Sequence, residues 1–402
     1  MSSLDDRIAR HDAAPAPGAG HALVLGDLDI TGPLREHGTP VTLMRRRDEP
    51  SRFSRSGVRW TEQPTLEQLP AALVAAAREL PGPVVLYVAE DVTLRVVSQH
   101  RDRLRKDLSF VLPEPDVVDT LLDKGRFQDL ALRRGLPVPD GMVITTAEDI
   151  AATDRLDLPV LIKPLDWREE TIETDFGGAK AAVATTRSEA RALLDRVADA
   201  GQRVLVQHFI PGAETAVESY HVYVDADGRI AAEFTGRKIR THPAEFGYST
   251  ALTTTDEQDV IDLGRQVVRA VGLVGVAKVD FKRDATGKLW VFEVNARFNL
   301  WHRLGAAAGC NIPALVFSDL TGRPRPEFTR GRSGLTWSRQ PRDLLTAHEQ
   351  GMPLSDYLRW LRQCDVVSGL RISDPMPFLR GSVPIQARAG MLRARHRRQP
   401  PV

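Results

Sequence analysis

The sequence predicts a protein of mixed α/β and α+β class that contains more than one structural unit. Short apolar strands alternate with a helical segment near the start of the chain, which is typical of a parallel α/β layer. Further along, pairs of strands are separated by short polar turns, which is typical of antiparallel hairpins. At 402 residues, of which 42% are hydrophobic, the chain can bury cores for two or three such units.

The first folded unit is expected at residues 21–115. Residues 1–20 end in a run of Ala, Pro and Gly that cannot pack, so they are expected to form a flexible lead-in. Apolar strands are expected at residues 22–26, 40–44 and 83–88, with a helical turn at 33–37. Gly26 lacks the neighbouring glycines of a dinucleotide-binding turn, so NAD binding is not expected.

An α+β unit is expected at residues 116–203. An amphipathic helix begins at Lys124 and stops at Gly135. Strands at 159–163 and 204–210 flank a second amphipathic helix at 187–200.

The next unit, at residues 204–325, is expected to contain two hairpins. The first joins strands 217–224 and 230–234, and the second joins strands 276–282 and 289–297. Residues 326–402 are expected to form a C-terminal extension with helical segments near Leu344 and at 354–361, followed by a basic tail.

Composition narrows the possible partners. The formal net charge is +1, so no global electrostatic attraction to nucleic acid or to an anionic membrane is expected. The two cysteines, Cys310 and Cys364, lie far apart without metal-ligand spacing, which favours a reducing, cytoplasmic location. We expect neither a signal peptide nor a membrane span, because no apolar run has the required length.

Lysine is rare in this chain, and its positions are informative. Eight lysines stand against 46 arginines, and four of them form an ordered series: Lys124, Lys163, Lys180 and Lys238. Compact ammonium groups suit phosphate oxygens, and Lys180 follows two glycines whose backbone can close over phosphates. The alternative for Lys163 is a solvated strand end, and for Lys180 a surface turn.

The second hairpin is expected to carry a metal site. Strand alternation places Glu293, Asn295 and Arg297 on one face, with Phe292 and Val294 on the other. Asp280 shares the first face if the hairpin register allows it. Carboxylate and amide oxygens of this kind suit Mg²⁺, although a solvated sheet face with alternating charge is the simpler alternative.

The strand at residues 204–210 ends at a glycine turn, and the chain at this turn can bind a nucleoside. Backbone groups at such an exit can bind an adenine edge, and Glu214 can accept hydrogen bonds from ribose hydroxyls. An edge strand with an exposed glutamate is the alternative.

Taken as a set over residues 115–325, these motifs resemble the ATP-grasp superfamily, whose members clamp ATP between two α+β subdomains behind an N-terminal α/β domain. Further segments resemble the D-aspartate ligase-like group of predicted carboxylate–amine ligases. They lie at residues 53–55, 207–212, 236–240 and 297–313.

The resemblance implies a role for each motif. ATP contacts are implied for Lys124 and Lys163 at the phosphates, for Gln207, His208, Phe209 and Ile210 along the adenine, and for Glu214 at the ribose. Mg²⁺, or Mn²⁺, is implied at Asp280, Glu293 and Asn295, and Arg297 is expected to stabilise the transferring phosphoryl group. Gln207 and Asp280 depart from the family pattern, since glutamate is common at both places.

We therefore expect an ATP-dependent carboxylate–amine ligase that acts through an acyl phosphate on small molecules. Arg237, Lys238 and Arg240 are expected to contact the phosphate or the substrate carboxylate, with a cationic hairpin edge as the alternative. The competing functions are a nucleotide-binding regulator without ligase activity, and an ATP-dependent carboxylase or phosphotransferase. A homodimer is possible.

Overall fold

The computed structural model describes residues 20–26, 28–47, 49, 53, 58–165, 176, 181–243, 247–369, 376 and 379–380. Several predicted features lie outside these residues: nearly all of the lead-in, the basic tail, and Lys180 with most of its glycine loop.

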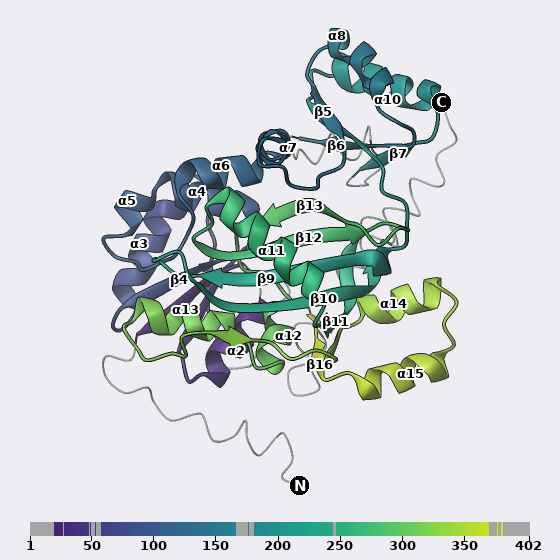
Figure 1. Cartoon of the computed structure of the whole chain (residues 1–402). Coiled ribbons are helices and arrows are strands. Elements are labelled where there is room, and N and C mark those ends of the chain that lie inside the picture. Colours follow the sequence, from purple (N-terminus) through teal and green to yellow (C-terminus); the bar gives the residue numbers. More distant parts are fainter. Residues whose placement is uncertain are drawn as a thin grey trace.

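The N-terminal unit is a four-stranded parallel sheet, which confirms the predicted parallel layer (Figure 1). Its strands are β3 (Arg59–Glu62), β2 (Val41–Arg45), β1 (His21–Leu25) and β4 (Val84–Val88), in that order across the sheet. Every residue of β1 and β4 is buried. Strand β1 lies inside the sheet, whereas β4 ends it but has both faces packed in hydrophobic clusters. Strand β3 was not predicted, since its exposed edge carries a charge at each end.

Helices surround this sheet and lead away from it. They are α2 (Thr31–Glu36), α3 (Leu69–Glu79), α4 (Asp91–Gln99), α5 (Arg101–Leu104), α6 (Pro115–Leu122) and α7 (Lys124–Arg133), with the 3-10 turn η1 (Leu28–Ile30). The predicted start of α7 is confirmed, because the Asp123 carboxylate caps it by accepting the amides of Gly125 and Arg126 at 2.8 and 3.0 Å. Gly135, at φ 65°, ends it.

A small antiparallel sheet forms the upper lobe in Figure 1. Its strands are β5 (Gly141–Ile144), β8 (Val204–His208), β6 (Val160–Pro164) and β7 (Ala182–Ala184), in that order. The lobe also holds α8 (Ala147–Ile150), η3 (Ala151–Arg155) and α10 (Arg187–Asp199). Since β8 is central to this sheet, the lobe extends to His208 rather than ending at the predicted boundary of 203.

The large sheet has eight strands. Seven follow the order β13 (Leu289–Asn295), β12 (Gly275–Arg283), β9 (Val217–Val224), β10 (Ile230–His242), β11 (Tyr248–Thr255), β15 (Thr336–Arg339) and β16 (Val366–Ser368), while β14 (Thr329–Arg330) pairs with β10. Both predicted hairpins are present. The last three strands correct the predicted boundary at 325, because the C-terminal extension completes this sheet.

Helices cover the large sheet and flank one end of it (Figure 1). They are α11 (Gln258–Val271), α12 (His302–Ala307), α13 (Ile312–Leu320), α14 (Arg342–Glu349) and α15 (Leu354–Gln363), with η4 (Glu214–Ala216) before β9. Gly264 lets α11 lie close to β9, since a Cβ there would approach Tyr220 Cγ to 2.4 Å. None of the described helices is long and apolar enough to cross a membrane.

The N-terminal sheet and the large sheet share one hydrophobic core. Leu86 and Val88 of β4 belong to the same buried cluster as Val222, Val268 and Phe281. The small sheet has its own core, formed by residues such as Ile162, Leu194 and Val206. The large sheet is therefore fixed to the N-terminal unit, whereas the small sheet is a separately packed lobe.

Candidate active site

The predicted site residues gather where the small sheet meets the large one. Lys163 Nζ of β6 lies 5.1 Å from the centre of the Phe292 ring of β13, and Lys282 Nζ of β12 lies 5.2 Å from the ring of Phe209, which follows β8. We call this region the sheet junction. It brings together strands from both lobes, as the clamp predicted from the sequence requires.

Lys163 is held in place by a chain of amides. Its Nζ donates to Gln207 Oε1 at 2.9 Å, and Gln207 Nε2 donates to Gln128 Oε1 at 2.7 Å. Gln128 Nε2 in turn donates to the Pro139 carbonyl at 2.8 Å. The side chain of Gln207 was predicted to border the adenine, but the structure places it between Lys163 and Gln128, where it orients the lysine.

The pKa of Lys163 is also unusually low. Burial, together with the charge of Lys124, lowers the pKa of Lys163 to about 8, against the opposing effect of Glu293. Lys124 Nζ donates to the Pro164 carbonyl at 3.4 Å. Two neighbouring ammonium groups repel one another, so an anion bound between them is favoured.

Two backbone amides at the end of β8 already donate hydrogen bonds within the protein. The amide of His208 donates to the Asp140 carbonyl at 2.7 Å, and that of Phe209 donates to the Pro159 carbonyl at 2.9 Å. The amide of buried Ile210, by contrast, makes no hydrogen bond to any described residue. Of the four residues predicted at the adenine, Ile210 is therefore the one with an available donor.

Glu214 and Lys238 form an ion pair. Lys238 Nζ of β10 lies 3.3 Å from Glu214 Oε2, and both side chains are less than one-fifth exposed. The structure thus brings the predicted ribose ligand next to a predicted catalytic lysine. Lys238 also affects a predicted metal ligand, because its charge helps to lower the pKa of Asp280.

The register of the second hairpin confirms that its carboxylates share a face. Asp280 of β12 lies directly opposite Glu293 of β13, and Lys278 lies opposite Asn295. Residues paired in this way have Cβ atoms about 4.5–5.5 Å apart.

Cationic and hydroxyl neighbours keep Asp280 ionised. Burial alone would raise the pKa of Asp280, but Lys278 and Lys238 lower it below its usual value. Lys278 Nζ lies 2.6 Å from Asp280 Oδ2, and Ser219 Oγ donates to Oδ1 at 2.5 Å.

The predicted orientation of Phe292 is wrong. A β-bulge lies between the Asp280 and Phe281 pairings, where Glu293 pairs with Asp280 but Val291 pairs with Phe281. Phe292 is the extra residue, so alternation breaks there and its ring lies beside Lys163 rather than in the core. No feature of the local sequence marks this bulge.

Arg297 connects Asn295, a predicted metal ligand, to the N-terminal unit. Its Nε and Nη2 donate to Asp91 Oδ1 and Oδ2 at 2.6 and 2.9 Å, and Nη2 also donates to Asn295 Oδ1 at 3.2 Å. Burial opposes its charge, but Asp91, and then Glu293 and Asp280, raise the pKa of Arg297 above its usual value. Asp91 begins α4, 206 residues away, and no sequence pattern linked it to the site.

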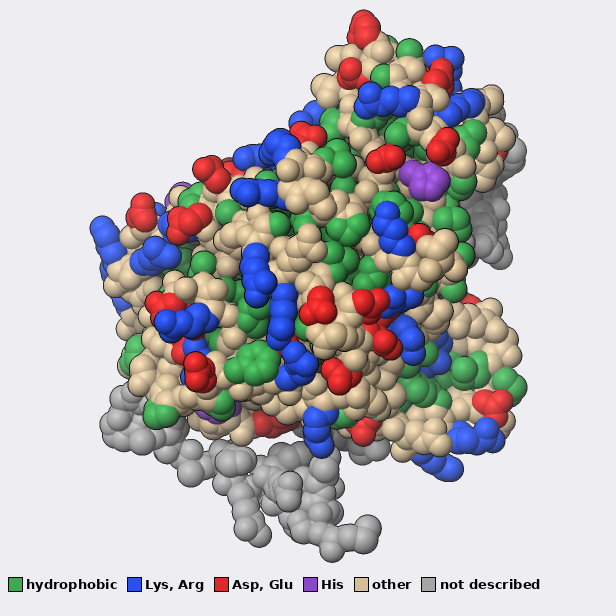
Figure 2. Space-filling model, in the orientation of Figure 1, with side chains coloured by type: hydrophobic (Ala, Val, Ile, Leu, Met, Phe, Trp, Pro, Cys, Tyr) green, Lys and Arg blue, Asp and Glu red, His purple; other side chains and the backbone are tan. Residues whose placement is uncertain are grey.

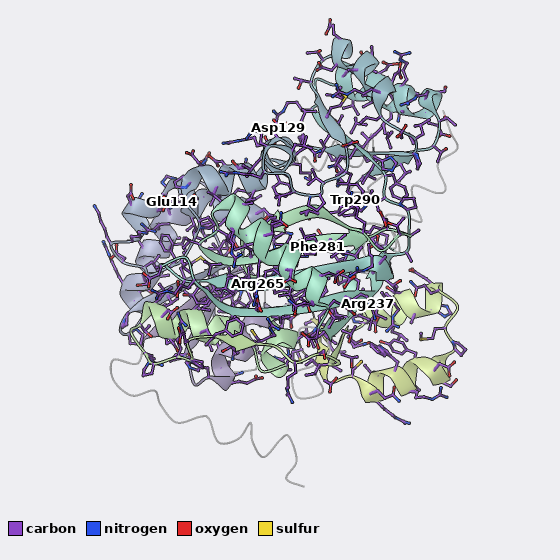
Figure 3. All side chains as sticks on the ribbon, viewed as in Figure 1. Glu114, Asp129, Arg237, Arg265, Phe281 and Trp290 are labelled. Carbon is purple, nitrogen blue, oxygen red and sulfur yellow. The ribbon has the colours of Figure 1, made fainter. Side chains whose placement is uncertain are left out.

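The basic residues predicted to act together on β10 lie in different surroundings. Arg240 is buried and forms a two-pronged pair with the fully buried Asp343 of α14, at 2.7 and 2.8 Å. Its predicted contact with substrate is therefore corrected to a structural contact, since the side chains of Arg240 and Asp343 are only 5% and 0% exposed and their pair lies inside the protein. Arg237 is exposed on the side of the sheet near α14 (Figure 3).

The donor set fits a hard divalent cation. Asp280 and Glu293 supply carboxylate oxygens and Asn295 supplies an amide oxygen, which is the chemistry that Mg²⁺ prefers. Among the described residues, no group of three or more His, Cys, Asp or Glu side chains could hold a metal ion. The predicted set has two carboxylates and one amide.

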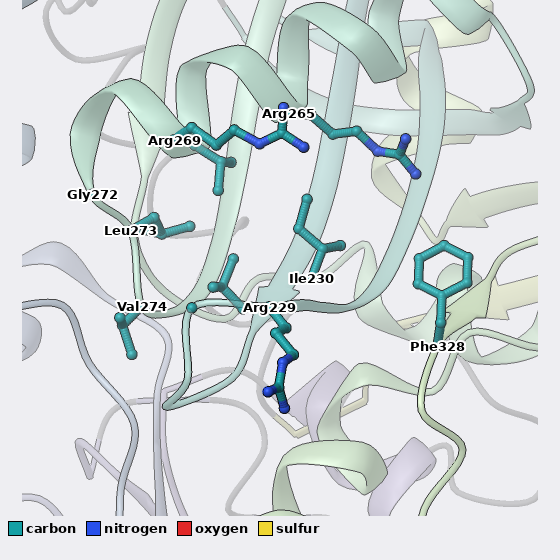
Figure 4. A pocket seen from close by; sticks show the side chains of 11 residues that line it. Arg229, Ile230, Arg265, Arg269, Gly272, Leu273, Val274 and Phe328 are labelled. Atoms are coloured by element: carbon teal, nitrogen blue, oxygen red, sulfur yellow. The ribbon is translucent and has the colours of Figure 1, made fainter.

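A surface hollow lies away from the sheet junction. About 690 Å³ in volume, it is lined by the end of α11 and the turn between β9 and β10, including Arg229, Arg269 and Phe328 (Figure 4). It contains none of the predicted site residues, and we assign it no part in the site.

The sheet junction thus brings two neighbouring lysines, opposed carboxylates and an arginine to the place where two sheets meet. Residues 201–340 match the family model described as an ATP-grasp in the biosynthetic pathway with Ter operon. The predicted resemblance to the ATP-grasp superfamily is thereby confirmed.

Two curated relatives show what the chain is similar to. A D-aspartate ligase of Enterococcus faecium (strain Aus0004) is 25% identical over 261 residues, covering 61% of this chain and 61% of the relative. A D-alanine–D-alanine ligase of Pseudomonas entomophila (strain L48) is 26% identical over 221 residues, covering 50% and 63%. The chain thus spans less than two-thirds of the length of these relatives.

Solved structures confirm the fold. An L-amino acid ligase from Bacillus licheniformis superimposes with a TM-score of 0.58 at 16% identity, covering 76% of this chain and 75% of the other. The ADP complex of an N5-carboxyaminoimidazole ribonucleotide synthetase gives 0.58 at 14% identity, covering 80% of both. At these identities the likeness concerns the fold alone.

Proposed function

We propose that this chain is an ATP-dependent carboxylate–amine ligase that forms an amide bond between small molecules. One observation carries the proposal: Lys163, Glu293 and Arg297 lie in one electrostatic neighbourhood at the sheet junction, with Asp280 paired to Glu293. The relatives named as D-aspartate and D-alanine–D-alanine ligases support it, since both names describe a ligase that acts on an amino acid.

The proposed reaction has two steps. A carboxylate oxygen of the first substrate attacks the γ-phosphorus of ATP, the bond to the bridging oxygen breaks, and ADP leaves. The amine nitrogen of the second substrate then attacks the acyl carbon, phosphate leaves, and the nitrogen loses a proton.

The residues of the chain act mainly through charge. Lys163, oriented by Gln207, and Lys124 bind phosphate oxygens, while Arg297, fixed by Asp91, faces the transferring group. Mg²⁺ or Mn²⁺ bound at Asp280, Glu293 and Asn295 would neutralise further phosphate charge.

Phosphate release tests this proposal. We expect purified protein with Mg·ATP to release phosphate only when an acid and an amine are both present, with amino acids and dipeptides as the first pools. Mass spectrometry of each active pool is expected to show a product equal to the two substrates less water. Phosphate release that needs no amine would indicate phosphotransfer. ATP binding without phosphate release from any pool would favour a nucleotide-binding regulator without ligase activity.

ATP affinity is expected to fall as pH rises from 7 to 9. The pKa of Lys163 is lowered to about 8, so the ammonium that binds phosphate is present below that pH and is lost above it. Isothermal titration of Mg·ATP across this range measures the effect.

Lys163→Arg is the matched control for this pH dependence, because a guanidinium stays charged throughout. Its affinity is expected to vary less with pH than that of the wild type. Equal slopes for both proteins would show that Lys163 does not control nucleotide binding.

A further inference from the structure

Three arginines surround the apolar hollow beside α11. Arg229, Arg265 and Arg269 line it, and none of the described residues in its lining is acidic. Its hydrophobic lining consists of Val224, Ile230, Val268, Leu273, Val274 and Phe328. Phe328 is 44% exposed. Figure 2 shows basic side chains following one another across the middle of the face on which α11 lies. The hollow thus combines apolar atoms with positive charge.

Arg265 shares its carboxylate partner with a second arginine. Its Nε and Nη2 donate to Glu233 at 2.9 and 2.7 Å, and Nε and Nη2 of Arg330 donate to the same carboxylate at 3.0 and 2.7 Å. Glu233 is fully buried and also accepts from Tyr220 at 2.8 Å. One negative charge therefore faces two positive charges, and the surplus favours an anion nearby.

The other two arginines have donors available for a ligand. Arg269 is exposed, and its side chain makes no hydrogen bond or ion pair with any residue that the structure describes. Arg229 pairs with Asp227 at 3.1 Å, but the two side chains are 74% and 69% exposed, and pairs so exposed contribute little. Both guanidiniums can therefore bind an oxyanion through two parallel hydrogen bonds.

The end of α11 does not by itself account for this lining. A cation in the last turn complements the helix dipole, which would explain Arg269. The Arg269 carbonyl, however, already accepts the amide of Gly272 at 3.2 Å. Arg229 lies in the turn between β9 and β10, and Phe328 precedes β14, so the helix requires neither of them. A hollow that separate segments line with apolar side chains and a few charged groups has the composition of a ligand site.

We propose that this hollow binds a small organic anion with a phosphate or carboxylate head and an apolar body. The head binds Arg269, while Arg229 and Arg265 add positive charge. The body packs on Ile230 and Phe328, and in Figure 4 Ile230 lies among the three arginines. The volume of about 690 Å³ is in the usual range for small-molecule sites. The site is separate from the sheet junction, and the proposal does not depend on the proposed activity.

Calorimetric titration of the full chain with phenyl phosphate and with benzoate tests the proposal. At least one of these probes is expected to bind with a Kd of about 1 mM or below, and about 10-fold tighter than inorganic phosphate or acetate, which lack the ring. Arg269→Ala is expected to weaken that probe at least about 10-fold, because charge-assisted hydrogen bonds are lost. Hydrogen exchange of the wild type is expected to show that the bound probe protects the turn between β9 and β10 and the end of α11.

Phe328→Ala separates the apolar contact from the charge. This variant is expected to lose most of the advantage that the ring gives, while inorganic phosphate binds as it does to the wild type. Arg191→Ala is the matched control, because it removes an exposed arginine of α10 in the small lobe, and it is expected to bind the probe normally.

Two results would overturn the proposal. The first is that neither probe binds the wild type at about 10 mM, well above the expected Kd. The second is that binding is unchanged in Arg269→Ala. If Mg·ATP also abolished such binding, the probe would occupy the sheet junction instead of this hollow.

Discussion

Replacing Arg297 with alanine is expected to lower kcat by about 10²–10³-fold, the usual cost of removing one preorganised group that stabilises transition-state charge. Arg297 is charged, half-buried near Asp280 and Glu293, and held by Asp91 in a fixed orientation. ATP binding should be largely kept, because Lys124 and Lys163 are untouched. Steady-state kinetics on the substrate pair found by phosphate release, with a separate ATP titration, measure both quantities.

Two further variants sharpen this test. Arg297→Lys keeps the charge but not the two-pronged geometry toward Asp91, so we expect partial activity. Arg133→Ala removes an exposed arginine at the end of α7 and should leave kcat unchanged. Near-normal turnover of the Arg297→Ala variant would exclude the role that we give to this residue.

Replacing Asp343 with alanine is expected to lower the free energy of unfolding by about 3–5 kcal/mol, as is found when one partner of a buried ion pair is removed. Asp343 is fully buried, and the variant leaves the guanidinium of Arg240 uncompensated in the protein interior. It also removes the acceptor for Ser338 Oγ, which donates at 2.6 Å, and for Trp360. Urea unfolding followed by tryptophan fluorescence measures the change.

Two controls separate this buried pair from ordinary surface charge. Asp356→Ala removes a partly exposed carboxylate on α15 and should change stability by less than about 1 kcal/mol. The double variant Arg240→Met, Asp343→Leu should recover part of the loss, because no charge is then left unpaired. If Asp343→Ala were as stable as Asp356→Ala, Arg240 would be available for the role first predicted for it.

Local patterns in the sequence were sufficient to predict much of the fold. The continuous apolar runs of β1 and β4 predicted a parallel layer, and the turn before Gly287 predicted the hairpin that opposes Asp280 and Glu293. The start of α7 was also predictable, because the Asp123 cap and Lys124 are adjacent in sequence. Each of these features is encoded within a few residues or by the period of a strand.

The features that escaped prediction depend on residues that are distant in sequence. Asp91 contacts Arg297 across 206 positions, and Asp343 contacts Arg240 across 103. Alternation placed Phe292 on the same face as Val294, but a bulge shifts it by one residue, and its ring lies beside Lys163. Such contacts are set by tertiary packing, for which a single sequence carries no periodic signal.

The pairing of β11 with β15 affects how the chain folds during synthesis. When β10 and β11 emerge from the ribosome, neither Asp343 nor the strands that continue their sheet have yet been made. Non-local pairing of this kind is slow, and until it occurs it leaves a strand edge exposed. The N-terminal sheet and the small lobe can therefore form early, whereas the large sheet is completed only after β15 and β16 have been made. Nascent chains that stall before Asp343 should be prone to aggregate.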